Sequence, residues 1–171
     1  LFDKPVTAAG YPIKHEDPIE QGDASQGWCI NFPIGKYDLS NNEKGFKKVN
    51  YAGTGFMCIE RKVFQTIIDK YPDIEYQTDV RAKIDDVRET SDVIGNKEYA
   101  FFDCGIQGKG ILEDKENTKR YLSEDFYFCQ LWKQCGGEIW ADLTSNLQHI
   151  GIKNYTRKPI LKLKEKENEN V

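Results

Sequence analysis

The 171-residue sequence lacks the features that mark several large classes of protein. It contains no apolar run of about 18 residues, the length typical of a membrane-spanning helix. It has no basic stretch followed by an apolar core at its start, so no secretory signal is recognised. Lysine and arginine are scattered and the net charge is −4, which argues against a nucleic-acid partner. We therefore expect a cytoplasmic or membrane-peripheral protein with no transmembrane segment.

The sequence also lacks paired cysteines. Its five cysteines form no Cys-x-x-Cys motif and none of the spacings typical of zinc sites. Cys129 and Cys135 fall inside an apolar helical pattern, which suits small core residues better than a disulfide. We expect reduced, mostly buried thiols.

The composition is that of a folded globular protein. Hydrophobic residues make up 39% of the chain and aromatic residues 12%, which is too apolar for a disordered sequence. The length favours a single domain, and no internal repeat is present. We predict one domain over residues 1–157, followed by a charged, mobile tail over residues 158–171.

Several segments have strand character. Val6–Ala9 is a short apolar run closed by glycine and proline, which predicts a buried strand. Residues 13–50 show little periodicity, and we expect a long excursion there with a hairpin around 28–32. Residues 51–59 predict a strand broken by glycines, and residues 99–102 form an aromatic, strand-like run.

Two segments have helical character. Apolar residues recur at helical spacing from Arg61 and predict a helix that Pro72 ends. Ser123 is expected to cap a second helix, which a left-handed Gly136 would end. With residues 139–141 and 147–150 as two further short strands, the order of elements indicates an α/β fold.

Two adjacent carboxylates, Glu124 and Asp125, open the second helix after a glycine-rich loop. Acidic residues in a first helical turn are stabilised by the free N–H groups and the helix dipole, by about 0.3–1 kcal/mol each. Alternatively, one of them is a general base that deprotonates a sugar hydroxyl. The residues alone leave both explanations open, with the structural one favoured.

Three further positions are candidates for a binding or catalytic role. His149 lies in an apolar strand and is either a core residue or a metal ligand. The run Gly53, Thr54, Gly55 matches neither a phosphate-binding loop nor a dinucleotide fingerprint, and marks either a bulge or a close approach of the backbone to a ligand. Asp103 follows Phe101 and Phe102, and aromatic rings with a carboxylate suit sugar recognition, although core packing explains the two phenylalanines equally well.

Taken in order, five blocks resemble the second half of a GT-A-fold glycosyltransferase of the family-2 type. They are residues 51–57 (YAGTGFM), 61–64 (RKVF), 121–125 (YLSED), 136–142 (GGEIWAD) and 147–151 (LQHIG). The resemblance implies a mixed sheet flanked by helices. It also implies transfer of a sugar from a nucleotide-sugar donor to a carbohydrate or other hydroxyl acceptor.

The resemblance also assigns roles to individual residues. Asp125 is similar to the family's base and Glu124 would orient the acceptor. His149 is similar to a C-terminal ligand of a divalent ion, Mn²⁺ or Mg²⁺. Residues 53–55 resemble the segment that lines the donor sugar.

The chain departs from the family pattern at its start. The family's Asp-x-Asp metal motif and nucleotide-binding strands should precede residues 3–11, and nothing in this sequence corresponds to them. Either an upstream domain supplies them, with metal bound only by the complete enzyme, or this protein has lost donor binding.

Two other functions remain open. A carbohydrate-binding or assembly module derived from such an enzyme would need neither base nor metal. A hydrolase using Glu124 and Asp125 as a pair is the weakest alternative, because adjacent residues at a helix start do not flank one glycosidic bond.

Overall fold

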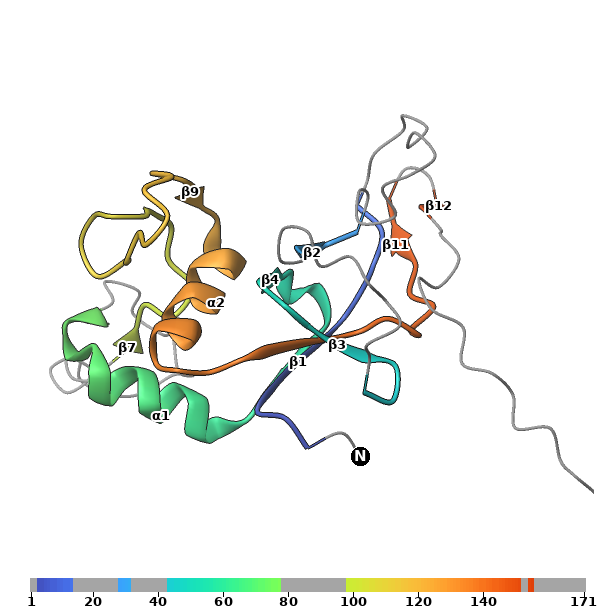
Figure 1. Cartoon of the computed structure of the whole chain (residues 1–171), viewed down its shortest axis with the longest axis horizontal. Helices are drawn as coiled ribbons and strands as arrows, with labels where there is room; N and C mark the ends of the chain where they lie inside the picture. Colours follow the sequence, from blue (N-terminus) through green and yellow to red (C-terminus); the bar gives the residue numbers. More distant parts are fainter. Residues whose placement is uncertain (1–2, 14–27, 32–42, 78–97, 152–153, 156–171) are drawn as a thin grey trace, which may run out of the picture. The chain divides into compact units, whose positions relative to one another are not determined.

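The computed structural model describes residues 3–13, 28–31, 43–77, 98–151 and 154–155. The chain forms two compact units (Figure 1). The first comprises Leu1–Glu60 and Gly136–Val171, and the second comprises Arg61–Cys135. The predicted tail over residues 158–171 lies outside the described residues.

The first unit is built on a four-stranded mixed sheet. Its strand order is β3 (Phe46–Val49), β10 (Ile139–Asp142), β1 (Val6–Ala9) and β5 (Met57–Ile59). β1 and β10 pair in parallel, and the two outer strands pair antiparallel. The strands predicted at residues 6–9 and 139–141 are therefore confirmed as the centre of the sheet. Both carry small or branched apolar residues that are buried, as a central strand requires.

The strand β3 was missed by the sequence analysis. It lies in the expected excursion, and its sequence contains two lysines, so its alternation is weak. Lys47 is nevertheless buried, whereas Lys48 is exposed and pairs with Glu138 at 2.6 Å. Backbone pairing with β10 defines this strand more than side-chain hydrophobicity does.

The hairpin expected around residues 28–32 is wrong in its pairing. β2 (Ile30–Asn31) pairs antiparallel with β4 (Tyr51–Ala52), a segment distant in sequence. Trp28 forms a bridge with Pro12. Residue 32 itself lies outside the described residues.

The predicted strand over residues 51–59 is interrupted, as its glycines suggested. β4 is followed by a 3₁₀ turn, η1 (Thr54–Phe56), and then by β5. The predicted strand at 147–150 is shorter than expected: β11 (His149–Ile150) pairs with β12 (Asn154–Tyr155).

The second unit contains both α-helices. α1 (Arg61–Lys70) buries Val63 and Ile67 one turn apart, in agreement with the predicted apolar stripe. The helix ends before Pro72, which opens a 3₁₀ turn, η2 (Pro72–Ile74). This first predicted helix is confirmed.

The second helix, α2 (Glu124–Gln134), is also confirmed, and residues 127–132 along it are all buried. Gly136 has φ +85°, the left-handed conformation predicted for the end of this helix. Ser123 occupies the N-cap position, but its hydroxyl makes no capping hydrogen bond and donates to Asp125 instead.

The aromatic run at 99–102 differs from the prediction. β7 (Glu98–Tyr99) pairs with β6 (Glu75–Tyr76), and the strand ends at Tyr99. Phe101 then packs against Phe64 with ring centroids 4.8 Å apart, and Phe102 stacks on Phe128 at the same separation. Packing onto the helices takes precedence over strand propensity here.

A second short pairing in this unit joins β8 (Gly105–Ile106) to β9 (Tyr121–Leu122).

None of the five cysteines takes part in a disulfide. The expectation that most are buried is wrong, because Cys58 and Cys104 are exposed and only Cys129 is fully buried.

Among the described helices none is long and apolar enough to cross a membrane. The chain is thus an α/β protein with a mixed sheet and two α-helices, whereas the GT-A topology and the flanking of the sheet by helices stay predictions.

Candidate functional site

In the first unit, His149 lies on β11 with its ring half-buried. Its Nδ1 is 3.0 Å from the carbonyl oxygen of Pro12. Because a carbonyl oxygen can only accept, Nδ1 is the donor of this hydrogen bond. The ring also meets Tyr11 edge to face, with centroids 5.6 Å apart. A backbone carbonyl orienting one nitrogen is the usual arrangement of a metal-binding histidine.

Tyr11 links His149 to the glycine run. The Gly55 amide donates to Tyr11 Oη at 3.2 Å. A Cβ added at Gly53 would lie 2.5 Å from Tyr11 Oη, and one at Gly55 would lie 2.6 Å from the Tyr11 ring. The two glycines therefore permit close approach of the tyrosine, a role within the protein itself that the sequence did not reveal. Thr54, between them, is exposed.

In the second unit, Asp125 is held by one carboxylate oxygen. Oδ1 accepts hydrogen bonds from Ser123 Oγ at 2.5 Å and from the Phe126 amide at 2.8 Å. Oδ2 accepts none from the residues that the structure describes. The side chain is half-buried at the first turn of α2, where the helix dipole stabilises its negative charge. One oxygen thus fixes the carboxylate and the other stays available to a proton donor.

Glu124 precedes Asp125 and is exposed on the same first turn. Asp103 lies in the turn after β7, where its Oδ1 accepts a hydrogen bond from the Cys104 amide at 2.7 Å. This bond fixes the Asp103 side chain at the rim of a cavity.

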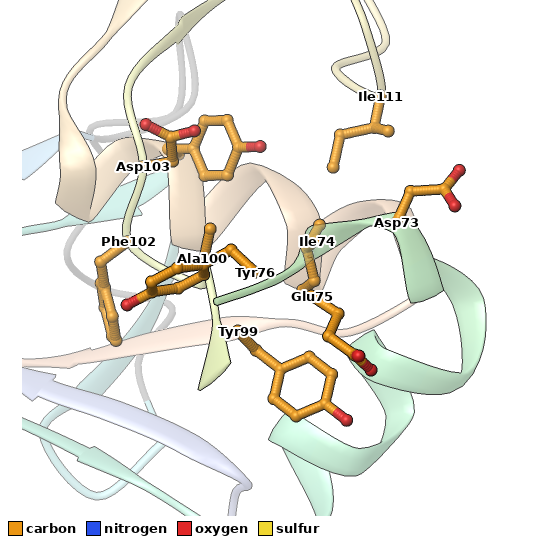
Figure 2. Close-up of a pocket in the computed structure, with 10 residues that line it drawn as sticks. Asp73, Ile74, Glu75, Tyr76, Tyr99, Ala100, Phe102, Asp103 and Ile111 are labelled. Carbon is orange, nitrogen blue, oxygen red and sulfur yellow. The ribbon is translucent and has the colours of Figure 1, made fainter. Parts of the chain in front are cut away.

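That cavity lies in the second unit (Figure 2). Its volume is about 750 Å³, within the range of about 300–1,000 Å³ typical of small-molecule sites. Its described lining combines four aromatic side chains with three carboxylates: Tyr76, Tyr99, Phe102, Tyr127, Asp73, Glu75 and Asp103. The remaining lining residues are Ile74, Ala100 and Ile111. We call this the β6–β7 cavity.

Burial raises the pKa of the Tyr127 hydroxyl, and the negative charge of Asp103 raises it further. Tyr127 therefore stays neutral over the physiological range and keeps a hydroxyl proton to donate. The pKa of Tyr76 is also raised, through a hydrogen bond to Glu98 and that residue's charge.

The predicted site residues thus fall into two groups. His149 and residues 53–55 meet through Tyr11 in the first unit. Asp103, Glu124 and Asp125 belong to the second unit.

Sequence reasoning missed Tyr11 in the first group and Tyr76 and Tyr99 in the second. The dipeptide Glu-Tyr occurs at both 75–76 and 98–99, but the long separation hid their pairing.

No cluster of three or more histidine, cysteine or acidic side chains suited to a metal occurs among the described residues. The role of His149 as a metal ligand stays a prediction. No family model, curated protein or solved structure matches the chain.

Proposed function

We infer that this chain is the acceptor-side part of a glycosyltransferase, which moves a sugar from a nucleotide-sugar donor to a hydroxyl acceptor. The observation that supports it most is the arrangement of Asp125. A general base needs an ionised carboxylate in a fixed position with a free oxygen. Ser123 and the Phe126 amide provide the fixed position, and Oδ2 provides the oxygen.

In this mechanism Asp125 Oδ2 accepts the proton of the acceptor hydroxyl. At the same time the hydroxyl oxygen of the acceptor attacks the anomeric carbon of the donor sugar. The nucleoside diphosphate departs with the electrons of the broken bond. Glu124, exposed beside Asp125, would orient the acceptor through its hydroxyl groups.

His149 would hold a divalent ion, Mn²⁺ or Mg²⁺, through Nε2. When bound, the ion would neutralise the negative charge that develops on the diphosphate. The residues present fit this role in one respect: Pro12 O orients the ring and fixes the tautomer that leaves Nε2 able to coordinate. Tyr11, packed edge-on against the ring, restricts its rotation.

A second candidate is a carbohydrate-binding module without catalysis. The β6–β7 cavity favours it, since aromatic and acidic side chains alone can bind a sugar. Such a module would need neither Asp125 as a base nor His149 as a ligand, so the two candidates differ in their response to substitution.

The test is Asp125→Asn in the full-length gene product. Asparagine keeps an oxygen that accepts from Ser123 Oγ and the Phe126 amide, but it cannot take a proton. We expect kcat for sugar transfer to fall by about a hundredfold or more, whereas donor binding, measured by calorimetry, changes little.

The matched control is Asp69→Asn, which neutralises an exposed carboxylate on α1 that accepts a hydrogen bond from Gln65. It should transfer sugar at the wild-type rate. Transfer by Asp125→Asn within about tenfold of wild type would remove Asp125 from the base role.

A further inference from the structure

We propose that the β6–β7 cavity binds a neutral saccharide ring and serves as a subsite for the acceptor. The binding claim stands on the cavity itself, and only the acceptor role rests on the proposed function. Figure 2 shows Asp103 on one side of the cavity in the view, with Asp73 and Glu75 on the other.

The aromatic platform is Phe102. Its ring stacks on Phe128 with centroids 4.8 Å apart and an interplanar angle of 23°, so the core fixes its orientation. The side chain nevertheless remains 43% exposed. Tyr76, at 46% exposed, is a second aromatic surface on the same cavity. A fixed and exposed ring offers stacking to the C–H face of a pyranose with little loss of side-chain entropy on binding.

The polar groups of the cavity suit the hydroxyl edge of a sugar. Asp73, Glu75 and Asp103 present carboxylate oxygens, which accept hydrogen bonds from hydroxyl donors. Tyr127 remains neutral and adds a hydroxyl that can donate or accept. Asp103 is held in place through the Cys104 amide.

The charge of the lining selects between the two substrates of a glycosyl transfer. Asp73 and Asp103 line the cavity with carboxylates, and none of its described lining residues is basic. A nucleotide-sugar donor carries a diphosphate, which this negative surface would repel. A neutral saccharide meets no such repulsion. The cavity therefore fits an acceptor sugar and disfavours the donor.

The test measures saccharide binding directly, by saturation-transfer difference NMR. The probes are the methyl glycosides of glucose, galactose, mannose and N-acetylglucosamine. We expect at least one to bind, with the strongest transfer to its ring C–H protons. Phe102→Ala and Asp103→Asn should each weaken that binding by about tenfold. Tyr121→Ala, at a more exposed aromatic residue outside the described lining, should bind within about twofold of wild type.

Binding of none of the four glycosides would overturn the proposal, as would wild-type affinity in both cavity variants. Displacement of the glycoside by uridine diphosphate, or tighter binding of tetramethylammonium, would show that the cavity takes a charged ligand instead. If Phe102→Ala does not fold, as judged by circular dichroism, Asp103→Asn and Tyr76→Ala decide the outcome.

The two proposals fail in different ways. Glycoside binding without any sugar transfer would contradict the proposed function and leave the cavity assignment intact. Sugar transfer with an acceptor KM unchanged by Phe102→Ala would contradict the acceptor role of the cavity and leave the proposed function intact.

Discussion

Asp142 shows how one side chain can organise the segment that follows a strand. It is the last residue of β10, and its Oδ1 accepts hydrogen bonds from the Thr144 amide at 2.8 Å and the Thr144 hydroxyl at 2.7 Å. Its Oδ2 accepts from the Ser145 hydroxyl at 2.5 Å. Burial raises the pKa of this carboxyl, but the hydrogen bonds from Ser145 and Thr144 outweigh burial and hold the pKa below its usual value.

This pKa gives a pH-dependent prediction. A carboxyl whose pKa is lower in the folded state stabilises the fold above its unfolded pKa of about 3.9, and that contribution is lost as pH falls through the lower folded value. We therefore expect Asp142→Asn to lower the melting temperature near pH 7, and the gap from wild type to shrink below about pH 4. Thermal melts recorded from pH 7 to pH 3 measure both.

Thr144→Val is the matched variant, because it removes the hydroxyl donor and leaves the carboxylate in place. It should reduce the melting temperature at pH 7 by less than Asp142→Asn does. A gap between wild type and Asp142→Asn that stays constant from pH 7 to pH 3 would contradict this account of Asp142.

At the same scale, the role of Tyr11 could not be predicted from the sequence. The sequence marked Gly53 and Gly55 as unusual but gave two explanations, a bulge or a ligand. The structure adds a third, because the Tyr11 ring occupies the space that a Cβ would need. This contact joins residues far apart in the chain, and no local pattern encodes such a pair.

Among the elements, those with strong local signals were predicted best. α1 and α2 have apolar residues at helical spacing and clear end signals in Pro72 and Gly136, and both helices are confirmed. β1 and β10 are short apolar runs next to glycines and are confirmed too. β3 was not predicted, because its two lysines conceal the alternation of apolar and polar residues, although one of these lysines is buried. The strand predicted over residues 99–102 ends at Tyr99, because Phe101 and Phe102 pack against other aromatic side chains and not in a strand pairing.

Gln134, the last residue of α2, joins the elements of the second unit. Its Nε2 donates to Tyr71 Oη at 2.7 Å and to the Ile111 carbonyl at 2.8 Å. Its Oε1 accepts from the Glu113 amide at 2.9 Å. One side chain thereby ties α2 to the residue after α1 and to the loop before β9.

We expect Gln134→Ala to lower the free energy of unfolding by about 1–2 kcal/mol, because several polar groups lose their partner together. Urea denaturation followed by circular dichroism measures this change. Gln65→Ala is the control, since Gln65 makes one exposed hydrogen bond to Asp69 on α1. Its loss should stay within about 0.5 kcal/mol. Equal losses in the two variants would show that Gln134 does not join these elements.

For the whole molecule, the α/β class could be predicted from the order of strands and helices, but the division into units could not. One domain over residues 1–157 stays a prediction; the chain contains two compact units, and the second is inserted in sequence between two segments of the first. An insertion depends on which distant strands pair, here β1 with β10. The GT-A assignment rests on the order of the five sequence blocks and stays a prediction.

The candidate site was predictable to a similar degree. The sequence indicated His149, Asp125 and Asp103, whose roles stay predictions. In the structure these side chains contact Pro12 O, Ser123 Oγ and the Cys104 amide, respectively. It did not indicate the tyrosines of the β6–β7 cavity, because they come together only through pairing of β6 with β7.

The most direct test of the account is the rate of sugar transfer from a nucleotide-sugar as a function of manganese concentration. It compares the full-length gene product with its His149→Ala variant. We predict transfer that disappears with a chelator, and a manganese requirement raised by roughly tenfold or more in the variant. The melting temperature without metal should be nearly unchanged. Absence of transfer at every manganese concentration would contradict the account. An identical manganese requirement in the two proteins, with a lowered melting temperature in the variant, would contradict it too and make His149 a core residue.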